Sequence, residues 1–218
     1  YAFSENLRAL IGAGYKWQSL KASKHLTSQG AIDNGILYTF SNIEWQFAQD
    51  WLINLGFMVE NQEIDETNFS PRASIHYQLT PQHNFRVSAS TAYRTPSILE
   101  SNRFTKTEAY GLIDVELLSD DNLVAEEVKS LELAYYGSFF NGAFTVDWRA
   151  FHEDMTGGID HVEWDVDHQG WIAATDNVDG EVNFVSNSKN WQASGYDIQI
   201  TWLPFTGTSI ALQFANTR

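Results

Sequence analysis

The sequence contains no cysteine, which excludes disulfide bridges, thiolate nucleophiles and zinc sites built on cysteine. Proline and glycine are also few, with 4 and 14 in 218 residues, which argues against a low-complexity or collagen-like chain. No apolar run approaches the roughly 18 residues that suggest a transmembrane helix. Basic residues are scarce, and the net charge of -15 disfavours nucleic acid as a partner.

Catalytic signatures are missing as well. The sequence has no Gly-x-Ser-x-Gly nucleophile elbow, no phosphate-binding loop and no His-Glu-x-x-His metal pair. Paired carboxylates occur mainly in predicted loops, where burial can do little to shift their pKa values for acid-base chemistry. We therefore predict that the chain is not an enzyme.

What the sequence does contain is a regular alternation of apolar and polar residues. After Asn141-Gly142, the residues Phe144, Val146 and Trp148 alternate with polar or charged ones. A strand places alternate side chains on opposite faces, so this segment has one apolar and one charged face. The same pattern predicts about nine strands, near residues 7–18, 36–47, 51–60, 69–79, 85–94, 130–135, 143–154, 196–202 and 210–214.

The connections between these strands alternate between short and long. Short turns fall at residues 48–50, 80–84, 141–142 and 204–207, and longer segments at 21–35, 61–68, 96–127 and 156–190. A meander of this kind has all its short turns at one end and all its long loops at the other, as transmembrane barrels do. We predict an all-β fold, an antiparallel up-and-down segment of a transmembrane β-barrel that forms one domain over residues 1–218.

Several segments resemble the barrel of TonB-dependent outer-membrane receptors. The most specific is Thr91-Ala-Tyr-Arg-Thr-Pro-Ser97, which lies within the longer similar run of residues 69–100. Residues 43–47 with 55–57, residues 123–135 and residues 193–199 resemble the same family in the same order.

This resemblance implies energised import across the outer membrane of a Gram-negative bacterium. The nutrient would be a ferric siderophore, haem, cobalamin or an oligosaccharide. In that family a barrel of about 22 strands encloses an N-terminal plug. The expected partners are therefore outer-membrane lipid, the TonB complex through the plug, and a small-molecule or chelate ligand. Neither the plug nor the closing strands are recognisable, so we expect an internal part of a longer receptor.

Acidic residues gather in segments 96–127 and 156–190, which carry -12 of the net charge of -15. Because Ca²⁺ binds clustered carboxylate oxygens, the candidate metal ligands are Asp160, Glu163, Asp165 and Asp167. Their spacing fits no EF-hand pattern, so a solvated acidic loop without metal is the favoured interpretation. The pair His152 and Asp154 is interpreted as a hydrogen-bonded cluster at the rim, with a metal pair as the alternative.

The second acidic segment also holds the candidate ligand-binding residues of the predicted extracellular loops. These are Trp164, Asp165, Asp167, His168 and Trp171. Exposed aromatic rings in a loop can stack on a ligand. Burial of both tryptophans within the folded loop is the favoured interpretation, and ligand contact is the alternative.

Charged residues of both signs recur on the polar faces of neighbouring predicted strands. We expect them to face the barrel lumen: Arg72, Arg86, Arg94, Glu132, Asp147, Arg149 and Asp197. Binding of the plug or of an anionic substrate is one interpretation, and mutual ion pairing is the favoured one. Tryptophans near strand ends predict an interfacial aromatic belt, formed by Trp17, Trp45, Trp51, Trp191 and Trp202.

A secreted or cell-surface β-rich module that binds carbohydrate is the alternative function. Its recognition surface would be the two acidic segments. Such a module would be soluble without detergent, whereas a receptor wall would require it.

Overall fold

The structure is a computed structural model that describes residues 2–64, 66–109, 112–120, 122–164 and 178–218. Within these residues twelve strands form a single sheet, and their order is β1-β2-β3-β4-β5-β6-β9-β10-β11-β8-β7, with β12 paired to β11. Their bounds are β1 Ala2–Ser4, β2 Leu7–Leu20, β3 Ile32–Ala48, β4 Trp51–Gln62, β5 Asn68–Thr80, β6 His83–Arg94, β7 Phe104–Ala109, β8 Leu112–Ser119, β9 Glu126–Phe139, β10 Phe144–Trp164, β11 Val178–Trp202 and β12 Ile210–Thr217. The only helices among the described residues are the short α1, Ile98–Ser101, and the 3₁₀ turn η1, Phe140–Gly142.

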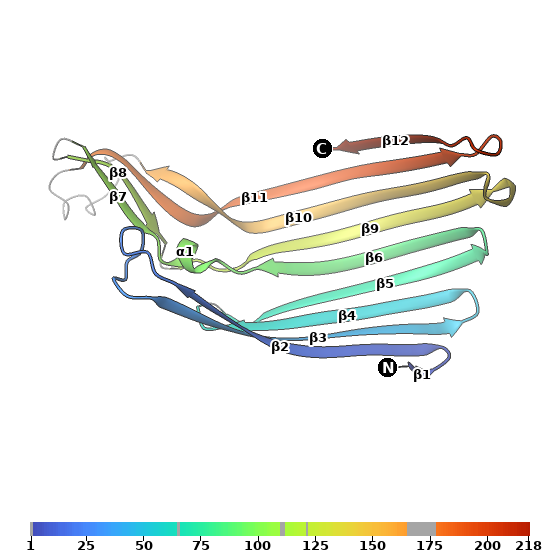
Figure 1. Cartoon of the computed structure of the whole chain (residues 1–218), viewed down its shortest axis with the longest axis horizontal. Helices are drawn as coiled ribbons and strands as arrows, with labels where there is room; N and C mark the ends of the chain where they lie inside the picture. The colour runs from blue at the N-terminus through green and yellow to red at the C-terminus, as the bar shows by residue number, and fades with distance from the viewer. Residues whose placement is uncertain (1, 65, 110–111, 121, 165–177) are drawn as a thin grey trace.

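The long strands run side by side, and their short connections lie together at one end of the molecule (Figure 1). This turn end holds the links β3–β4, β5–β6, β9–β10 and β11–β12. The opposite loop end holds the longer links, including the segment with α1, β7 and β8. The predicted antiparallel, up-and-down arrangement is therefore confirmed for the long strands, and the sheet remains open between its two edges.

The β9–β10 turn differs in detail from the predicted two-residue hairpin. Phe140, Asn141 and Gly142 all have positive φ, at 53°, 56° and 87°. Asparagine and glycine adopt this left-handed conformation readily, whereas a bulky residue such as Phe140 does so at a cost. The Asn-Gly pair therefore still directs the turn, which begins one residue earlier than the sequence pattern suggests.

Cross-strand register gives the sheet one apolar face and one polar face. Along the apolar face at the turn end, ring pairs connect neighbouring strands: Trp51 stacks on Tyr77 with centroids 4.4 Å apart, and Phe85 lies 4.9 Å from Tyr135. Aromatic rings with this placement form an interfacial belt in membrane barrels. The prediction that Trp191 joins the belt is wrong, because it lies opposite Met155 on the polar face.

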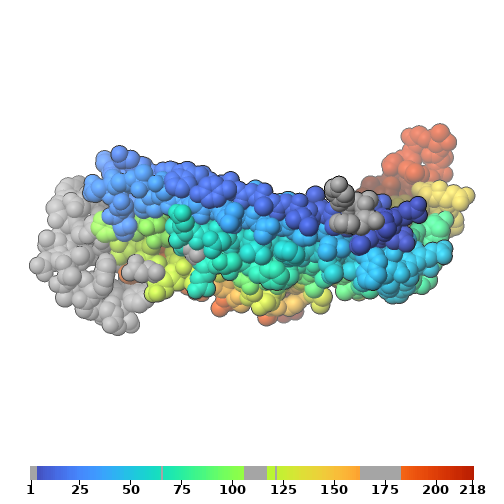
Figure 2. Space-filling view, turned by 90° about the horizontal axis from the view of Figure 1, so that it is seen from below, coloured from blue at the N-terminus to red at the C-terminus, as the bar shows by residue number. Residues whose placement is uncertain are grey.

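On the polar face, aromatic side chains of one strand lie over glycines of the next, and Gly12 is an example. Gly12 on β2 lies opposite Phe40 on β3. A Cβ at Gly12 would be only 2.4 Å from Cζ of Phe40, so the phenyl ring lies over bare backbone. Figure 2 shows the N-terminal strands packed side by side into one continuous surface along the long axis.

The loop end contains more regular structure than the sequence predicts. β10 continues to Trp164, and β11 begins at Val178, so much of the second acidic segment is strand. Within the first acidic segment, β7 and β8 form a hairpin, and β8 adds to β11 in parallel. The prediction of two plain acidic loops is wrong in this respect.

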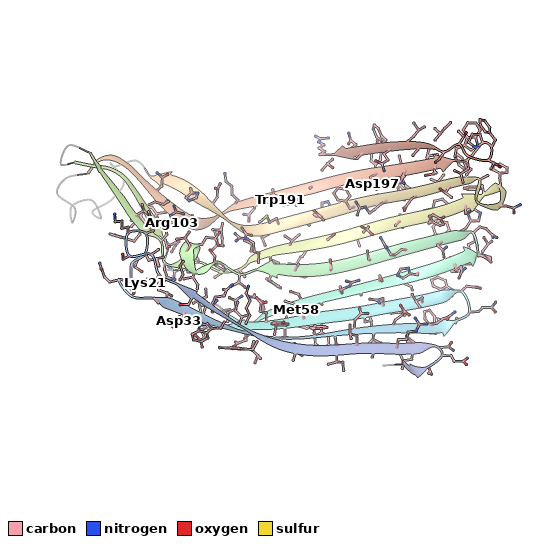
Figure 3. The ribbon with its side chains drawn as sticks, in the orientation of Figure 1. Lys21, Asp33, Met58, Arg103, Trp191 and Asp197 are labelled. Atoms are coloured by element: carbon pink, nitrogen blue, oxygen red, sulfur yellow. The ribbon has the colours of Figure 1, made fainter. Side chains whose placement is uncertain are left out.

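A small core supports the loop end. The link between β2 and β3 crosses to the start of β7, where Leu26 forms a β-bridge with Arg103. Leu26, Ile98 and Leu118 are each buried to 6% exposure or less. In Figure 3 Lys21, Asp33 and Arg103 lie at this end, whereas Asp197 lies along the long strands. Loop-end segments distant in sequence are thus fastened to one another by packing and hydrogen bonds.

Candidate functional site

The seven charged residues expected in the lumen lie on one face of the sheet. Arg72 lies opposite Ser90, Ser88 opposite Glu132, and Arg149 opposite Asp197. Since residues opposite each other in a ladder point to the same side, these pairs connect β5, β6, β9, β10 and β11 across one surface. The set on this polar face is Arg72, Arg86, Arg94, Glu132, Asp147, Arg149 and Asp197.

Four of these residues form a chain of ion pairs across four adjacent strands. Arg86 on β6 pairs with Glu132 on β9. Arg149 on β10 lies 3.4 Å from Glu132 and 2.8 Å from Asp197 on β11. Their side chains remain partly exposed, so each pair alone contributes little, and the chain contributes mainly by fixing the strands in register.

A fifth residue, Arg94, forms a separate cluster at the loop end. Its guanidinium pairs with Glu126 on β9 and lies 3.1 Å from Glu100 in α1. Glu126 has a side-chain exposure of 8% and also accepts a hydrogen bond of 2.6 Å from the backbone N–H of Ile159 on β10. Arg94 and Glu126 therefore join β6, α1, β9 and β10 where they meet.

Glu100 also closes the N-terminus of α1. Its backbone N–H donates to the Ser97 hydroxyl, and its carboxylate accepts from the Ser97 backbone N–H at 2.8 Å. Burial acts to raise the pKa of Glu100, but the hydrogen bonds from Ser97 and the nearby Arg94 outweigh it and hold the pKa below its usual value. The Ser97-x-x-Glu100 spacing is a capping box that the sequence alone could have shown.

Two of the seven residues have no ion-pair partner among the described residues. Arg72 and Asp147 have no group of opposite charge within 4.0 Å there. Arg72 lines a hollow of about 460 Å³ on the polar face, together with His76 and Arg86. In this hollow the buried Nε of Arg86 lacks a hydrogen-bond partner among the described atoms. Glu44 and Glu132 also line the hollow, so its two arginines face two carboxylates, and Arg72 is the cation there that no described carboxylate pairs.

The candidate loop residues are described only in part. Asp165, Asp167, His168 and Trp171 lie outside the described residues, and so do the side chains of Glu163 and Trp164. The backbone of Trp164 pairs with Val182 at the end of the β10–β11 ladder.

Asp160, the remaining candidate metal ligand, lies 3.2 Å from the ammonium of Lys189. Its carboxylate also accepts a 2.8 Å hydrogen bond from the backbone N–H of His161. Within the part of the chain that the structure describes, three metal-ligating side chains do not come together anywhere.

His152 and Asp154 lie on the apolar face, beyond its last apolar residues on β10. His152 Nε2 is 3.3 Å from the Asp154 carboxylate, and its Nδ1 is 2.7 Å from the Ser194 hydroxyl. This geometry is the hydrogen-bonded cluster that the sequence suggested, with Ser194 as an additional member.

The sequence matches a known protein family. Residues 1–216 match the sequence model of the family described as TonB-dependent receptor-like, beta-barrel. No curated protein matches the sequence. In the described part of the chain, helices are too short or too polar to cross a membrane.

Several solved structures share the fold at low identity. The siderophore receptor PirA from Pseudomonas aeruginosa superposes with a TM-score of 0.80 and 16% identity over 97% of this chain and 39% of that one. A ferric enterobactin receptor (PfeA) mutant from the same organism gives 0.79 and 16%, over 97% of this chain and 32% of that one. The FrpB iron transporter from Neisseria meningitidis gives 0.66 and 14%, over 100% and 34%.

The chain thus spans between about a third and two fifths of the length of these receptors. The family match covers nearly every residue, and the open sheet has the strand order and two-faced character of a barrel wall. This chain belongs to the TonB-dependent receptor family and forms part of its β-barrel domain.

Proposed function

We propose that this chain is a wall segment of an outer-membrane receptor that imports an iron chelate of the siderophore type. The observation that carries the proposal is the two-faced sheet, with an aromatic belt on one face and linked ion pairs on the other. A membrane barrel requires this separation, because its outside contacts lipid and its lumen is polar. The siderophore class is supported by similar structures named as siderophore and ferric enterobactin receptors.

The polar face would then line the lumen. The ion-pair chain of Arg86, Glu132, Arg149 and Asp197 holds the wall in register, and Arg72, without an ion pair among the described residues, is left to pair with an anionic group. In the whole receptor that group belongs either to a lumen-filling plug or to an anionic ligand in transit. Coupling to the TonB complex through such a plug is part of the same proposal.

The acidic segments at the loop end carry a separate proposal about cations. Asp160, with Glu163, Asp165 and Asp167, would bind Ca²⁺ if the segment folds so that the carboxylates converge. Trp164 and Trp171, with His168 between them, would contact the ligand in the same segment. Calorimetry on the whole receptor tests the first idea, and absence of Ca²⁺ uptake at millimolar concentration contradicts it.

Uptake by intact cells tests the import function. The whole receptor is expressed in cells that lack their own siderophore receptors, and radioactive iron is supplied as catecholate or hydroxamate chelates, as haem, or as a simple salt. We expect uptake from a siderophore chelate that stops when a protonophore dissipates the energy of the inner membrane. Uptake of cobalamin or an oligosaccharide in place of iron would contradict the proposed ligand class and leave the barrel assignment intact.

A further inference from the structure

On the apolar face, the stretch of apolar residues that starts at the turn end is not equally long on every strand. On β4 the residues from Trp51 to Val59 that point to this face are all apolar, whereas on β10 the corresponding stretch ends at Ala150. At about 3.3 Å per residue and a tilt of about 40°, these stretches rise about 20 Å on β4 and about 15 Å on β10. The apolar band is therefore lower on the β10 side.

Heights can be compared because the short turns lie together at one end (Figure 1). Pro71 on β5 is nine residues from Thr80, the turn-end residue of its strand. His152 is eight residues from Phe144, the turn-end residue of β10. At nearly equal height, the same face thus presents proline on β5 and histidine on β10.

Polar side chains continue from His152 across the neighbouring strands. Asp154 lies opposite Lys129 on β9, and His152 lies opposite Ser194 on β11. We call Lys129, His152, Asp154 and Ser194 the outward polar patch. Its histidine and lysine side chains are 47% and 60% exposed. The patch therefore faces the surroundings of the wall at a height where β4 and β5 are apolar.

Charged groups at this position would be costly in contact with lipid hydrocarbon. A lysine on the lipid face of a barrel costs about 2–4 kcal/mol at the bilayer midplane and about 0–1 kcal/mol near the interface. The internal hydrogen bond of His152 to Ser194 and the pairing of Lys129 with Glu127 reduce this cost but leave charge exposed. Placement of the patch among lipid headgroups removes most of it.

We propose that the outward polar patch contacts the headgroups of the outer leaflet, so that the hydrocarbon boundary lies about 5 Å lower along β9–β11 than along β4–β5. The membrane thins locally on this side of the receptor. The inference rests on the proposed placement of the barrel in a membrane. A bilayer accommodates a short apolar band by thinning, at a modest cost per ångström.

A protein partner fits the patch less well. Stable protein interfaces have an apolar centre depleted in charged residues. The outward polar patch has the opposite composition, with Lys129, His152 and Asp154 grouped together. Headgroups, which offer phosphate, sugar and hydroxyl groups, match a mixed set of cationic, anionic and neutral donors and acceptors.

Spin labelling of the whole receptor in liposomes tests the boundary directly. This segment has no cysteine, so labels are attached at His152→Cys, Pro71→Cys and Ile198→Cys after replacement of any cysteine elsewhere. Oxygen, which concentrates in hydrocarbon, and a water-soluble nickel chelate serve as relaxation probes. We expect oxygen to dominate at positions 71 and 198, and nickel to dominate at position 152.

The possible outcomes separate this inference from the proposed function. A label at position 152 that behaves like the label at 71 overturns the lowered boundary while the barrel assignment stands. A label at 152 that neither probe reaches indicates cover by protein and also overturns it. Dominant nickel relaxation at 71 and 198 as well would show that this face does not contact lipid, and the proposed function would fail too.

A second variant asks whether the patch itself sets the boundary. In a receptor labelled at Ser194→Cys, the double change His152→Leu with Asp154→Leu extends the apolar band, and the ratio of oxygen to nickel relaxation should rise severalfold. Glu153→Leu is the matched control, since Glu153 lies on the polar face opposite Ala193. An unchanged ratio in the double variant, or an equal rise in the control, contradicts the proposal.

Discussion

Arg149 and Asp197 lie directly opposite each other on β10 and β11, and their charged groups are 2.8 Å apart. The same guanidinium reaches Glu132 on the other side, at 3.4 Å. One cation therefore connects three strands, and through Glu132 it is linked to Arg86 on a fourth.

Replacement of this central cation should weaken the wall moderately. We expect Arg149→Met to lower the free energy of unfolding of the whole receptor by about 1 kcal/mol, since the group is half exposed and Glu132 keeps Arg86. Urea unfolding in detergent micelles measures the change. Asp147→Asn, on the same face and without an ion pair among the described residues, is the control and should change stability less.

Removal of the cation from the Arg94 cluster at the loop end should lower stability more strongly. Arg94→Met leaves the nearly buried Glu126 without its cation, which we expect to cost about 2 kcal/mol. Limited proteolysis should show faster cleavage within residues 95–103, where α1 loses its anchor. Arg72→Met, which removes an arginine without an ion pair among the described residues, should leave the cleavage rate unchanged. Equal sensitivity of the two variants would refute the anchoring role.

The capping box should lose strength in acid. The pKa of Glu100 is lower in the folded state than in the unfolded chain, so its contribution is complete above the unfolded value of about 4.3 and is lost as pH falls through the folded value. Hydrogen exchange at the backbone of residues 97–101 measures this. Protection in the wild type should exceed that in Glu100→Gln at neutral pH, and the difference should shrink below about pH 4. A constant difference would exclude this titration as its source.

The bare backbone beneath Phe40 should not tolerate a side chain. A Cβ at Gly12 meets the phenyl ring at 2.4 Å, so Gly12→Val should cost about 1–3 kcal/mol through overpacking. The cost should fall when the same change is made in a Phe40→Ala background. Gly30→Val, where the nearest atom is 3.7 Å away, is the control. An equal cost in both backgrounds would mean that the ring is not the obstacle.

The sequence predicts the nine long strands and their faces well because alternation is a local property. It fails where alternation is interrupted. The alternation predicts that β10 ends at Asp154, yet after register shifts between Met155 and Ile159 the strand continues to Trp164. Gly157, with a φ of 67°, allows this bulge, and period-two counting stops there.

The candidate site was predictable to a different degree. The polar faces of the strands identify Arg86, Glu132 and Asp197 as neighbours, but only the register shows which charges meet. In the sequence Glu126 is one acid among many in a predicted loop, and nothing local reveals that it lies opposite Arg94. Such contacts depend on where a long excursion returns to the sheet, which is a property of tertiary structure.

The pairing of Arg94 with Glu126 also closes the excursion between β6 and β9. The chain leaves the wall after Arg94 and rejoins it at Glu126, and these two residues are opposite each other in the same ladder. The wall therefore stays continuous beneath residues 95–125, whose strand β8 pairs with β11 and not with either flanking strand. Changes in this segment that spare Ile98, β8 and the bridge from Arg103 to Leu26 should leave β6 and β9 adjacent and in register.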